Sequence, residues 1–311
     1  MSSRFVSLTG AAILLSLSLK PVPAFAQVDL SGQWGAINQS DARTRGPGPD
    51  LMDQTTVPLN AEGKAVAASY SYSTISMPDR MCMDWSQDYI TFAPHAIMIE
   101  RLDDPVNGGI AAWRVSAGGS DRATMPIWID GRPHPSPNDL HTFNGFTTGL
   151  WEGGVLTGHM THMARGLTAR NGSPLSDQAK MTIHITRHAD ILTIMTLTED
   201  PIYLDAPLVQ AGSYRINPVG NAGPVNPPCY PLTEVPRLDV PGTVPHYLPG
   251  QNPNLETFAK AHNLGLETVS GGAENAYPEY RKKLKDTYKI PGECHVRDQG
   301  RQDCLPGPKR D

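Results

Sequence analysis

Residues 146–163 decide the fold, and they read FTTGLWEGGVLTGHMTHM. Gly153-Gly154 forms a two-residue turn inside this stretch, and a glycine pair between two strand-like runs is the strongest hairpin signal in the chain. A second hairpin is predicted over residues 180–199, where His188-Ala189-Asp190 marks another tight reversal. Two consecutive hairpins indicate an antiparallel sheet.

Further short runs extend this pattern in both directions. They are rich in β-branched and aromatic residues and are separated by turn residues, as the strands of a meander are. The runs lie at about 96–102, 109–117, 124–130, 146–152, 155–163, 180–188, 191–199 and 207–216, and Leu30 to Trp34 adds a strand start. Because a meander of this size removes its exposed edges by closing, we predict a mainly β protein. Residues 27–217 are expected to form a lipocalin-like β-barrel with a short helix at Asn60 to Tyr70.

The chain changes character after residue 217. Pro218 to Pro253 is rich in proline, which cannot donate regularly to a sheet, so we expect an extended strap over the barrel. Two short helices are predicted beyond it, one after Asn252-Pro253 that ends at Gly265 and one from about Pro278. Residues 218–311 are therefore expected to form a strap and a helical tail that pack on the barrel.

The first 26 residues have the pattern of an export signal. Arg4 supplies a positive start, Phe5 to Leu19 is apolar, and Ala24-Phe25-Ala26 matches a cleavage site. The apolar stretch is 15 residues long, which is shorter than the roughly 20 that a membrane-spanning helix needs. We expect removal of this segment and a periplasmic or secreted protein without a membrane anchor.

Charge and cysteine content narrow the classes of partner. Removal of residues 1–26 takes away Arg4 and Lys20, which lowers the net charge from −5 to −7. This balance argues against nucleic acid or an anionic membrane as the main partner, because both need a basic surface. The basic cluster at residues 281–285 is interpreted as a solvated helix face. Oligomeric state is left open.

Four cysteines follow the predicted cleavage site, and an even number in an exported chain predicts disulfides. Cys294 and Cys304 are nearest in sequence, which leaves Cys82 to pair with Cys229 by elimination.

Two sets of residues resemble known groups. Gly32-Gln33-Trp34 resembles the first strand of lipocalin-type barrels, in which the tryptophan closes the barrel floor against an arginine of the last strand, here matched by Arg215. The segment from Asp130 to Tyr203 resembles a large, mostly uncharacterised family of exported bacterial proteins. The matching residues are Asp130-Gly131-Arg132-Pro133-His134-Pro135, Gly149-Leu150-Trp151-Glu152-Gly153 and Asp200-Pro201-Ile202-Tyr203, with Gly154 in place of the usual acidic residue. This resemblance implies no particular activity.

The first of these motifs places three functional groups on one stiff turn. The carboxylate of Asp130, the guanidinium of Arg132 and the imidazole of His134 could bind an anionic substrate oxygen and move a proton. The alternative is structural: Asp130 and Arg132 lock the turn while the two prolines determine its path.

Histidines on the two hairpins are further candidates. Strand alternation puts His184 opposite the apolar residues Met181, Ile183 and Ile185, so His184 faces solvent if the apolar face fills the barrel. His159 shares a strand face with Glu152. Gly149 and Gly158 lie nearly opposite each other, and the space they leave is predicted to hold a ligand or the ring of Trp151.

Metal and cofactor sites are not expected. Imidazoles are common metal ligands, but His159 and His162 cannot bind the same ion because they point to opposite faces of a strand. The chain has no Walker loop, no convincing dinucleotide fingerprint and no nucleophile elbow, so no cofactor is predicted.

Two hypotheses of function follow. The first is a binding module whose lumen, lined by Trp, Met, Ile and Thr, holds a small and largely apolar or aromatic molecule. The second is a cofactor-independent lyase, isomerase or hydrolase in the same lumen. In the second, His159 or His184 transfers the proton and Asp130 or Glu152 is its partner. Ligand contacts are assigned to Arg132, His134 and Trp151. Lipocalin-like barrels serve both uses, so the fold does not decide whether the protein is an enzyme.

Overall fold

The computed structural model describes most of the chain from Val28 onward. The described residues are 28–37, 50–71, 81–83, 85–91, 96–117, 124–218, 230–231, 246–287, 295–297 and 301–303. The export signal, most of the strap, and Cys229, Cys294 and Cys304 lie outside these ranges. The predictions that concern them, both disulfides included, therefore stay predictions.

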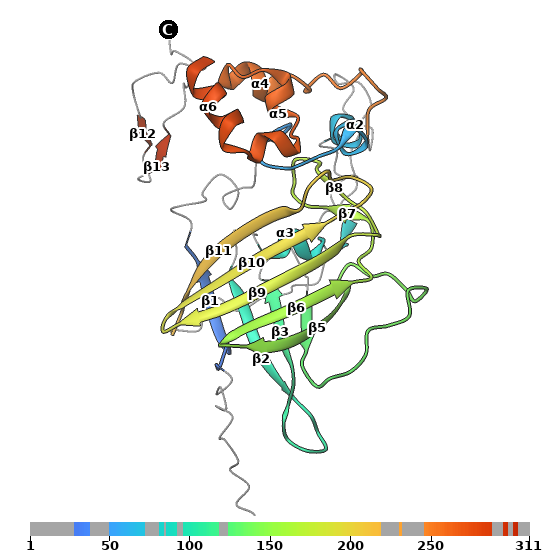
Figure 1. Ribbon diagram of the computed structural model, residues 1–311, viewed down its shortest axis with the longest axis vertical. Coiled ribbons are helices and arrows are strands. Elements are labelled where there is room, and N and C mark those ends of the chain that lie inside the picture. The colour runs from blue at the N-terminus through green and yellow to red at the C-terminus, as the bar shows by residue number, and fades with distance from the viewer. Residues whose placement is uncertain are drawn as a thin grey trace, which may run out of the picture.

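Within the described ranges, nine strands form one closed β-barrel (Figure 1). Their order around the barrel is β1-β11-β10-β9-β6-β5-β4-β3-β2, and β1 pairs with both β11 and β2. The predicted mainly β class and the closure of the meander are thus confirmed. The strands are β1 (Gly32–Ala36), β2 (Ile97–Asp103), β3 (Ile110–Ala117), β4 (Thr124–Trp128), β5 (Phe146–Glu152), β6 (Val155–Thr161), β9 (Lys180–His188), β10 (Ile191–Glu199) and β11 (Leu208–Ile216). Two small separate sheets pair β7 (Gly166–Leu167) with β8 (Pro174–Leu175), and β12 (His295–Arg297) with β13 (Arg301–Asp303).

One pairing of the barrel departs from the predicted antiparallel meander. β4 and β5 run parallel, with Ile127 opposite Thr147 and Trp128 opposite Thr148, whereas the other described barrel pairs are antiparallel. The cause is the connection at residues 129–145, which carries the chain back along the barrel before β5 begins. The barrel is therefore mixed, and this long loop lies outside its wall.

The interior of the barrel is filled by its own side chains. On β9, Met181, Ile183 and Ile185 point inward and are at most 1% exposed. Large rings from three other strands join the same core, namely Trp34, Trp113 and Tyr214. Because a side chain that touched a water-sized cavity would keep accessible surface, the described lumen has no room for a ligand. The hollow predicted from the sequence is not present.

The glycine pair on β5 and β6 serves this packing. Gly149 and Gly158 lie opposite each other, as predicted. A Cβ atom on Gly158 would lie 2.7 Å from Ile183 Cγ2, and one on Gly149 would lie 2.5 Å from Ile127 Cγ2. The space is therefore occupied by two isoleucines and is neither a ligand pocket nor a slot for Trp151.

The barrel floor is closed at Trp34, but by a different arginine from the predicted one. Trp34 is fully buried, its Nε1 donates to Leu30 O at 3.1 Å, and the guanidinium of Arg187 lies 5.1 Å from its ring centroid. Arg215 is exposed, because it follows the inward-facing Tyr214 on β11 and must point outward. The prediction of Arg215 as the stacking partner is wrong, and Arg187 of β9 has that position.

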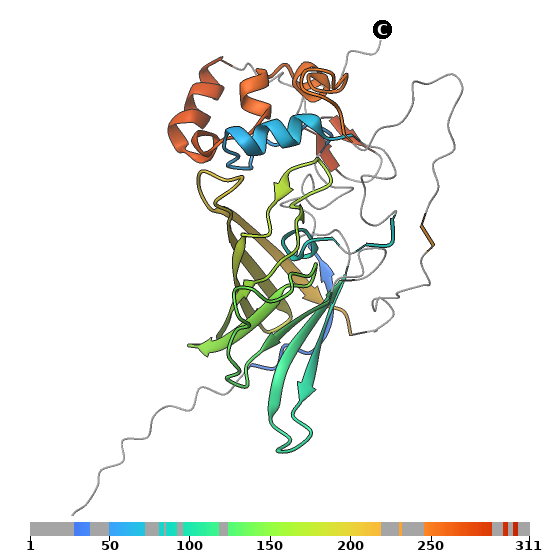
Figure 2. The same cartoon turned by 90° about the vertical axis from the view of Figure 1, so that its right-hand side faces the viewer.

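A helical layer covers the opposite end of the barrel (Figure 2). Asn60 begins α2 (Ala61–Ser69) as predicted, since its Oδ1 accepts from Gly63 N at 2.9 Å. Leu59 and Ala67 pack with Leu204 and Leu208 at the barrel end. α4 (Thr257–His262), α5 (Leu266–Val269), the 3-10 helix at Ala273–Ala276 and α6 (Pro278–Thr287) complete the layer.

The C-terminal helices contact the segment that leads into α2. Phe258, Ala259 and Val269 form one apolar cluster with Met52 and Tyr70. A cavity of about 10 Å³ beside this cluster has room for about one water. The domain boundaries at residues 26 and 217 stay predictions. None of the helices in the described segments is long and apolar enough to cross a membrane.

A short helix that the sequence did not predict sits beneath this layer. α3 (Gln87–Ile90) lies between the predicted helix at Asn60 to Tyr70 and the strand run at about 96–102, where the sequence predicts no helix or strand. Thr91 O accepts a hydrogen bond from Tyr214 Oη, and Gln87 Nε2 donates to Asn144 Oδ1 at 2.9 Å. These bonds attach the segment to β11 and to the loop before β5.

Candidate functional site

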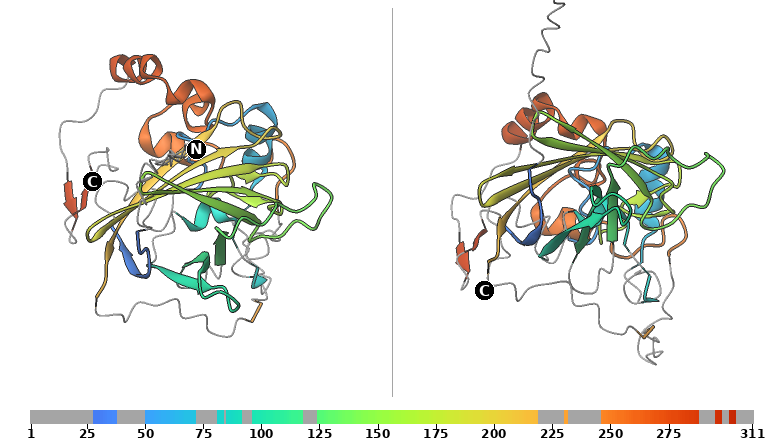
Figure 3. Two further views of the ribbon diagram at one scale, coloured as in Figure 1. Left: turned by 60° about the horizontal axis from the view of Figure 1, so that its bottom comes forward. Right: turned by 90° about the horizontal axis from the view of Figure 1, so that it is seen from below.

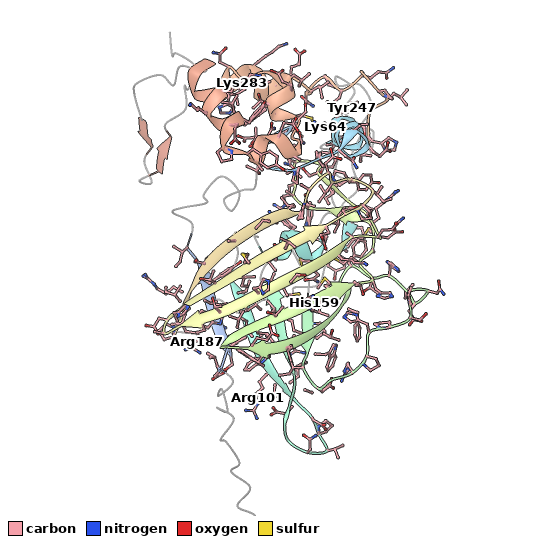
Figure 4. All side chains as sticks on the ribbon, in the orientation of Figure 1. Lys64, Arg101, His159, Arg187, Tyr247 and Lys283 are labelled. Carbon is pink, nitrogen blue, oxygen red and sulfur yellow. The ribbon has the colours of Figure 1, made fainter. Side chains whose placement is uncertain are left out.

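A row of outward side chains crosses the wall of the barrel at β4, β5, β6 and β9. Trp128 lies opposite Thr148, Thr148 opposite His159, and His159 opposite Thr182. These residues face outward because their chain neighbours, such as Ile127 and Met160, are buried in the core. Figure 4 shows His159 on the outer side of the sheet.

The loop at residues 129–145 brings Asp130, Arg132 and His134 to this row. Arg132 Nε and Nη2 donate to the two carboxylate oxygens of Asp130 at 2.9 and 2.6 Å. The Arg132 guanidinium also lies 3.4 Å from the centroid of the Trp128 ring. These hydrogen bonds lower the pKa of Asp130 and keep it ionised. The predicted structural alternative thus describes this pair, and Asp130 is not placed to accept a proton.

His134 hydrogen-bonds to two neighbouring strands, β5 and β6. Its Nε2 lies 2.8 Å from Thr148 Oγ1 and its Nδ1 lies 3.3 Å from Thr161 Oγ1, so both ring nitrogens have hydroxyl partners. Its ring meets Phe146 edge-on, with 5.5 Å between centroids. Burial, together with the nearby His162 and His159, lowers the pKa of His134. The imidazole is therefore neutral near pH 7. We call Trp128, Arg132, His134, Phe146, Thr148 and His159 the loop-side patch.

Two further histidines, His141 and His162, lie next to the loop-side patch, and the sequence analysis did not place them there. His162 lies past the end of β6 with a φ of 58°, and its Nδ1 lies 2.7 Å from Thr161 Oγ1. His141 contacts it with ring centroids 5.0 Å apart. Strand alternation separates His162 from His159 only while the strand continues, and the strand ends at Thr161. The end of the strand is the signal that could have shown that His162 does not follow the alternation of β6.

His159 and His184 form a four-residue set with two threonines. His184 Nδ1 lies 3.0 Å from Thr157 Oγ1, and His159 Nδ1 lies 3.4 Å from Thr182 Oγ1. Among the described residues, the Nε2 atom of each imidazole has no hydrogen-bond partner. Both rings are thus oriented through one nitrogen while the other is available on the outer wall.

Two predicted site residues are not brought to the loop-side patch. Glu152 is exposed at the end of β5, four residues from Thr148 or about 13 Å along the strand. Trp151 points the other way, because it packs against the barrel core with its Nε1 buried. The structure therefore brings together Asp130, Arg132, His134 and His159, places His184 beside them, and leaves Glu152 and Trp151 apart.

The arrangement has no feature of a metal centre within the described residues, where no three His, Cys, Asp or Glu side chains converge. No protein-family model matches the chain, and neither a curated protein nor a solved structure matches it significantly. The class of the protein, a closed mixed β-barrel capped by helices, is thus defined by its own structure, and the resemblance to exported bacterial proteins stays a prediction.

Proposed function

We propose that this protein is an exported binding protein that holds a small, largely apolar or aromatic organic molecule on the outer wall of its barrel. The observation that carries the proposal is the gathering of rings in the loop-side patch. Trp128, Phe146, His134 and His159 surround the hydroxyl of Thr148 and are at least partly exposed. Rings offer flat apolar surface to a ligand, and a few fixed polar groups set its orientation.

The electrostatics of the patch favour an uncharged ligand. The charges of Asp130 and Arg132 offset each other at 2.6 Å, and the lowered pKa of His134 keeps that ring neutral. His159 Nε2 is the polar atom best placed to hydrogen-bond a ligand, because its Nδ1 is already directed at Thr182. The ligand expected here has an aromatic or alicyclic body and one hydrogen-bonding group.

Binding is favoured over acid–base catalysis by the partners of the imidazoles. A proton-transfer pair needs two titratable groups within hydrogen-bond reach of the same reacting atom. The described histidines of this region bond to threonine hydroxyls and main-chain carbonyls instead. The predicted carboxylate partners are held by Arg132, in the case of Asp130, or lie about 13 Å along the strand, in the case of Glu152.

Native mass spectrometry of the mature protein against extracts of the growth medium tests the proposal. We expect one small molecule to be retained with its mass unchanged. His159→Ala should lower its affinity about tenfold through loss of the ring contact and the hydrogen bond. His188→Ala is the matched control, because His188 is an exposed imidazole at the end of the neighbouring strand β9, outside the loop-side patch.

Two results would contradict the proposal. A retained molecule whose affinity is the same in the wild type, His159→Ala and Trp128→Leu does not occupy the loop-side patch. A molecule that is released with altered mass, at a rate that His159→Ala abolishes, supports the enzyme hypothesis instead. Circular dichroism spectra of both variants confirm that they are folded.

A further inference from the structure

The broad outer face of β5, β6, β9, β10 and β11 has few charged residues for a surface that is exposed to water. Figure 3 shows these strands as one layer with β1, β2 and β3 on the other side of the barrel. One row across the layer runs Leu150, Thr157, His184, Met195 and Ala211. The two neighbouring rows also hold Glu152 at one corner, and Thr148 and His159 of the loop-side patch. We call the remaining twelve outward residues of the three rows the threonine face: Leu150, Val155, Thr157, Thr182, His184, Thr186, Thr193, Met195, Leu197, Val209, Ala211 and Ser213.

Apart from Glu152 at the β5 end of one row, the three rows contain no Asp, Glu, Lys or Arg, and they expose several aliphatic side chains. Leu150, Met195 and Val209 are 60%, 38% and 56% exposed. The opposite wall differs, because Arg114 and Glu100 form an ion pair at 2.7 Å on β3 and β2. A contiguous uncharged and partly apolar sheet face is typical of a surface that another molecule covers.

Charges lie at two corners of the face, one of each sign. Glu152 is exposed on β5 and Arg215 is exposed on β11, and neither has an ion-pair partner among the described residues. Four strand spacings separate β5 from β11, or about 19 Å, so these two side chains cannot reach each other within one chain.

We propose that the threonine face is the interface of a symmetric dimer of this chain. A two-fold axis parallel to the central strand β9 places β5 of one protomer against β11 of the second. Glu152 then meets the partner's Arg215, and the same contact repeats on the other flank. The charges at the corners thus complement each other between two copies of the chain, which they cannot do within one.

The size of the face agrees with this occupant. The twelve residues of the threonine face lie about 4.8 Å apart across the strands and about 6.7 Å apart along each strand, so they cover about 400 Å² in plan. The accessible area is larger than this flat projection, because side chains project from the sheet and because Glu152 and Arg215 add to it. It therefore approaches the roughly 800 Å² that each partner contributes to a standard interface. Threonine, leucine and methionine side chains are of the size that interdigitates when two sheets pack face to face.

Sedimentation velocity of the mature chain with charge-swap variants tests the dimer. Glu152→Arg and Arg215→Glu should each weaken dimerisation about tenfold, because each creates two like-charge contacts in a symmetric interface. The double variant should restore the wild-type constant to within about threefold, since it re-forms both pairs with reversed sign. Met195→Lys, at the centre of the face, should leave only monomer.

Val106→Lys is the control, because Val106 is 92% exposed on the β2–β3 loop, outside the threonine face. It should leave dimerisation unchanged. A wild-type chain that stays monomeric up to about 1 mM overturns the proposal. So does a dimer that Met195→Lys leaves intact, or a double charge swap that fails to restore association. Circular dichroism and thermal melting establish that each variant is folded.

Discussion

His134 illustrates how a single side chain on the outer wall is determined by distant neighbours. The sequence shows that this histidine lies on a turn with Asp130 and Arg132, and that grouping suggested acid–base chemistry. Its actual hydrogen bonds go to Thr148 and Thr161, which lie on two different strands. These hydroxyls, together with burial, make His134 a neutral bridge between the loop and the barrel wall.

Acidification should destabilise the protein through His134. Its pKa lies below the ordinary value of 6.5 in the folded state, chiefly because of burial, so the unfolded chain takes up the proton first as pH falls. The stability it contributes is fully present above pH 6.5 and is lost as pH falls toward the lowered pKa. Urea unfolding at a series of pH values below neutrality measures this loss. In His134→Gln the pH dependence should be shallower, and an unchanged slope would show that other groups cause it.

At the scale of elements, β5 and β6 each have a glycine at a position where a Cβ atom would collide with the barrel core. Gly149 and Gly158 let Ile127 and Ile183 extend over the glycine backbones. The sequence analysis located the glycine pair correctly but assigned the space to a ligand. Packing from β4 and β9 occupies it.

Gly158→Ala should lower the free energy of unfolding by about 1 to 3 kcal/mol, the usual range for overpacking a core. The added methyl group would lie 2.7 Å from Ile183 Cγ2 and 3.0 Å from Thr147 Cγ2. Gly35→Ala on β1 is the control, because its Cβ would meet its nearest neighbour at an ordinary 3.8 Å. Urea denaturation compares the two. A hollow barrel would tolerate both substitutions equally, so equal effects would refute the filled lumen.

Across the whole molecule, Asp200 connects the barrel to the helical layer. It is 3% exposed, and its carboxylate accepts hydrogen bonds from Ser176 N and Oγ and from the main-chain N–H groups of Ile202 and Tyr203. Tyr203 O in turn accepts from Asn60 N, at the start of α2. The Asp200-Pro201-Ile202-Tyr203 motif is therefore a structural corner.

Asp200→Ala should destabilise the protein by about 3 kcal/mol or more, because several buried donors lose their acceptor at once. Asp177→Ala, at an exposed carboxylate next to Ser176, should change stability by less than about 0.5 kcal/mol. Guanidinium unfolding followed by tryptophan fluorescence measures both. Comparable stabilities for the two variants would show that Asp200 does not hold the corner.

The outcome for individual elements shows what could be predicted. The strands over residues 146–199 and the start of α2 at Asn60 were predicted correctly, because alternation and capping depend on a few adjacent residues. The parallel pairing of β4 with β5, the exchange of Arg215 for Arg187 beneath Trp34 and the short helix α3 were not predicted. Each of these depends on contacts between segments far apart in the chain.

The sequence by itself determined that the chain forms a closed, mainly β barrel, and which side chains of each strand share a face, because strand alternation is a local property of the backbone. Only the tertiary structure decided that the inward residues fill the lumen, that Asp130, Arg132, His134 and His159 meet outside it, and which residues of five strands line up as the threonine face. These outcomes follow from register and closure, which bring residues of different strands together and which no short stretch of sequence encodes.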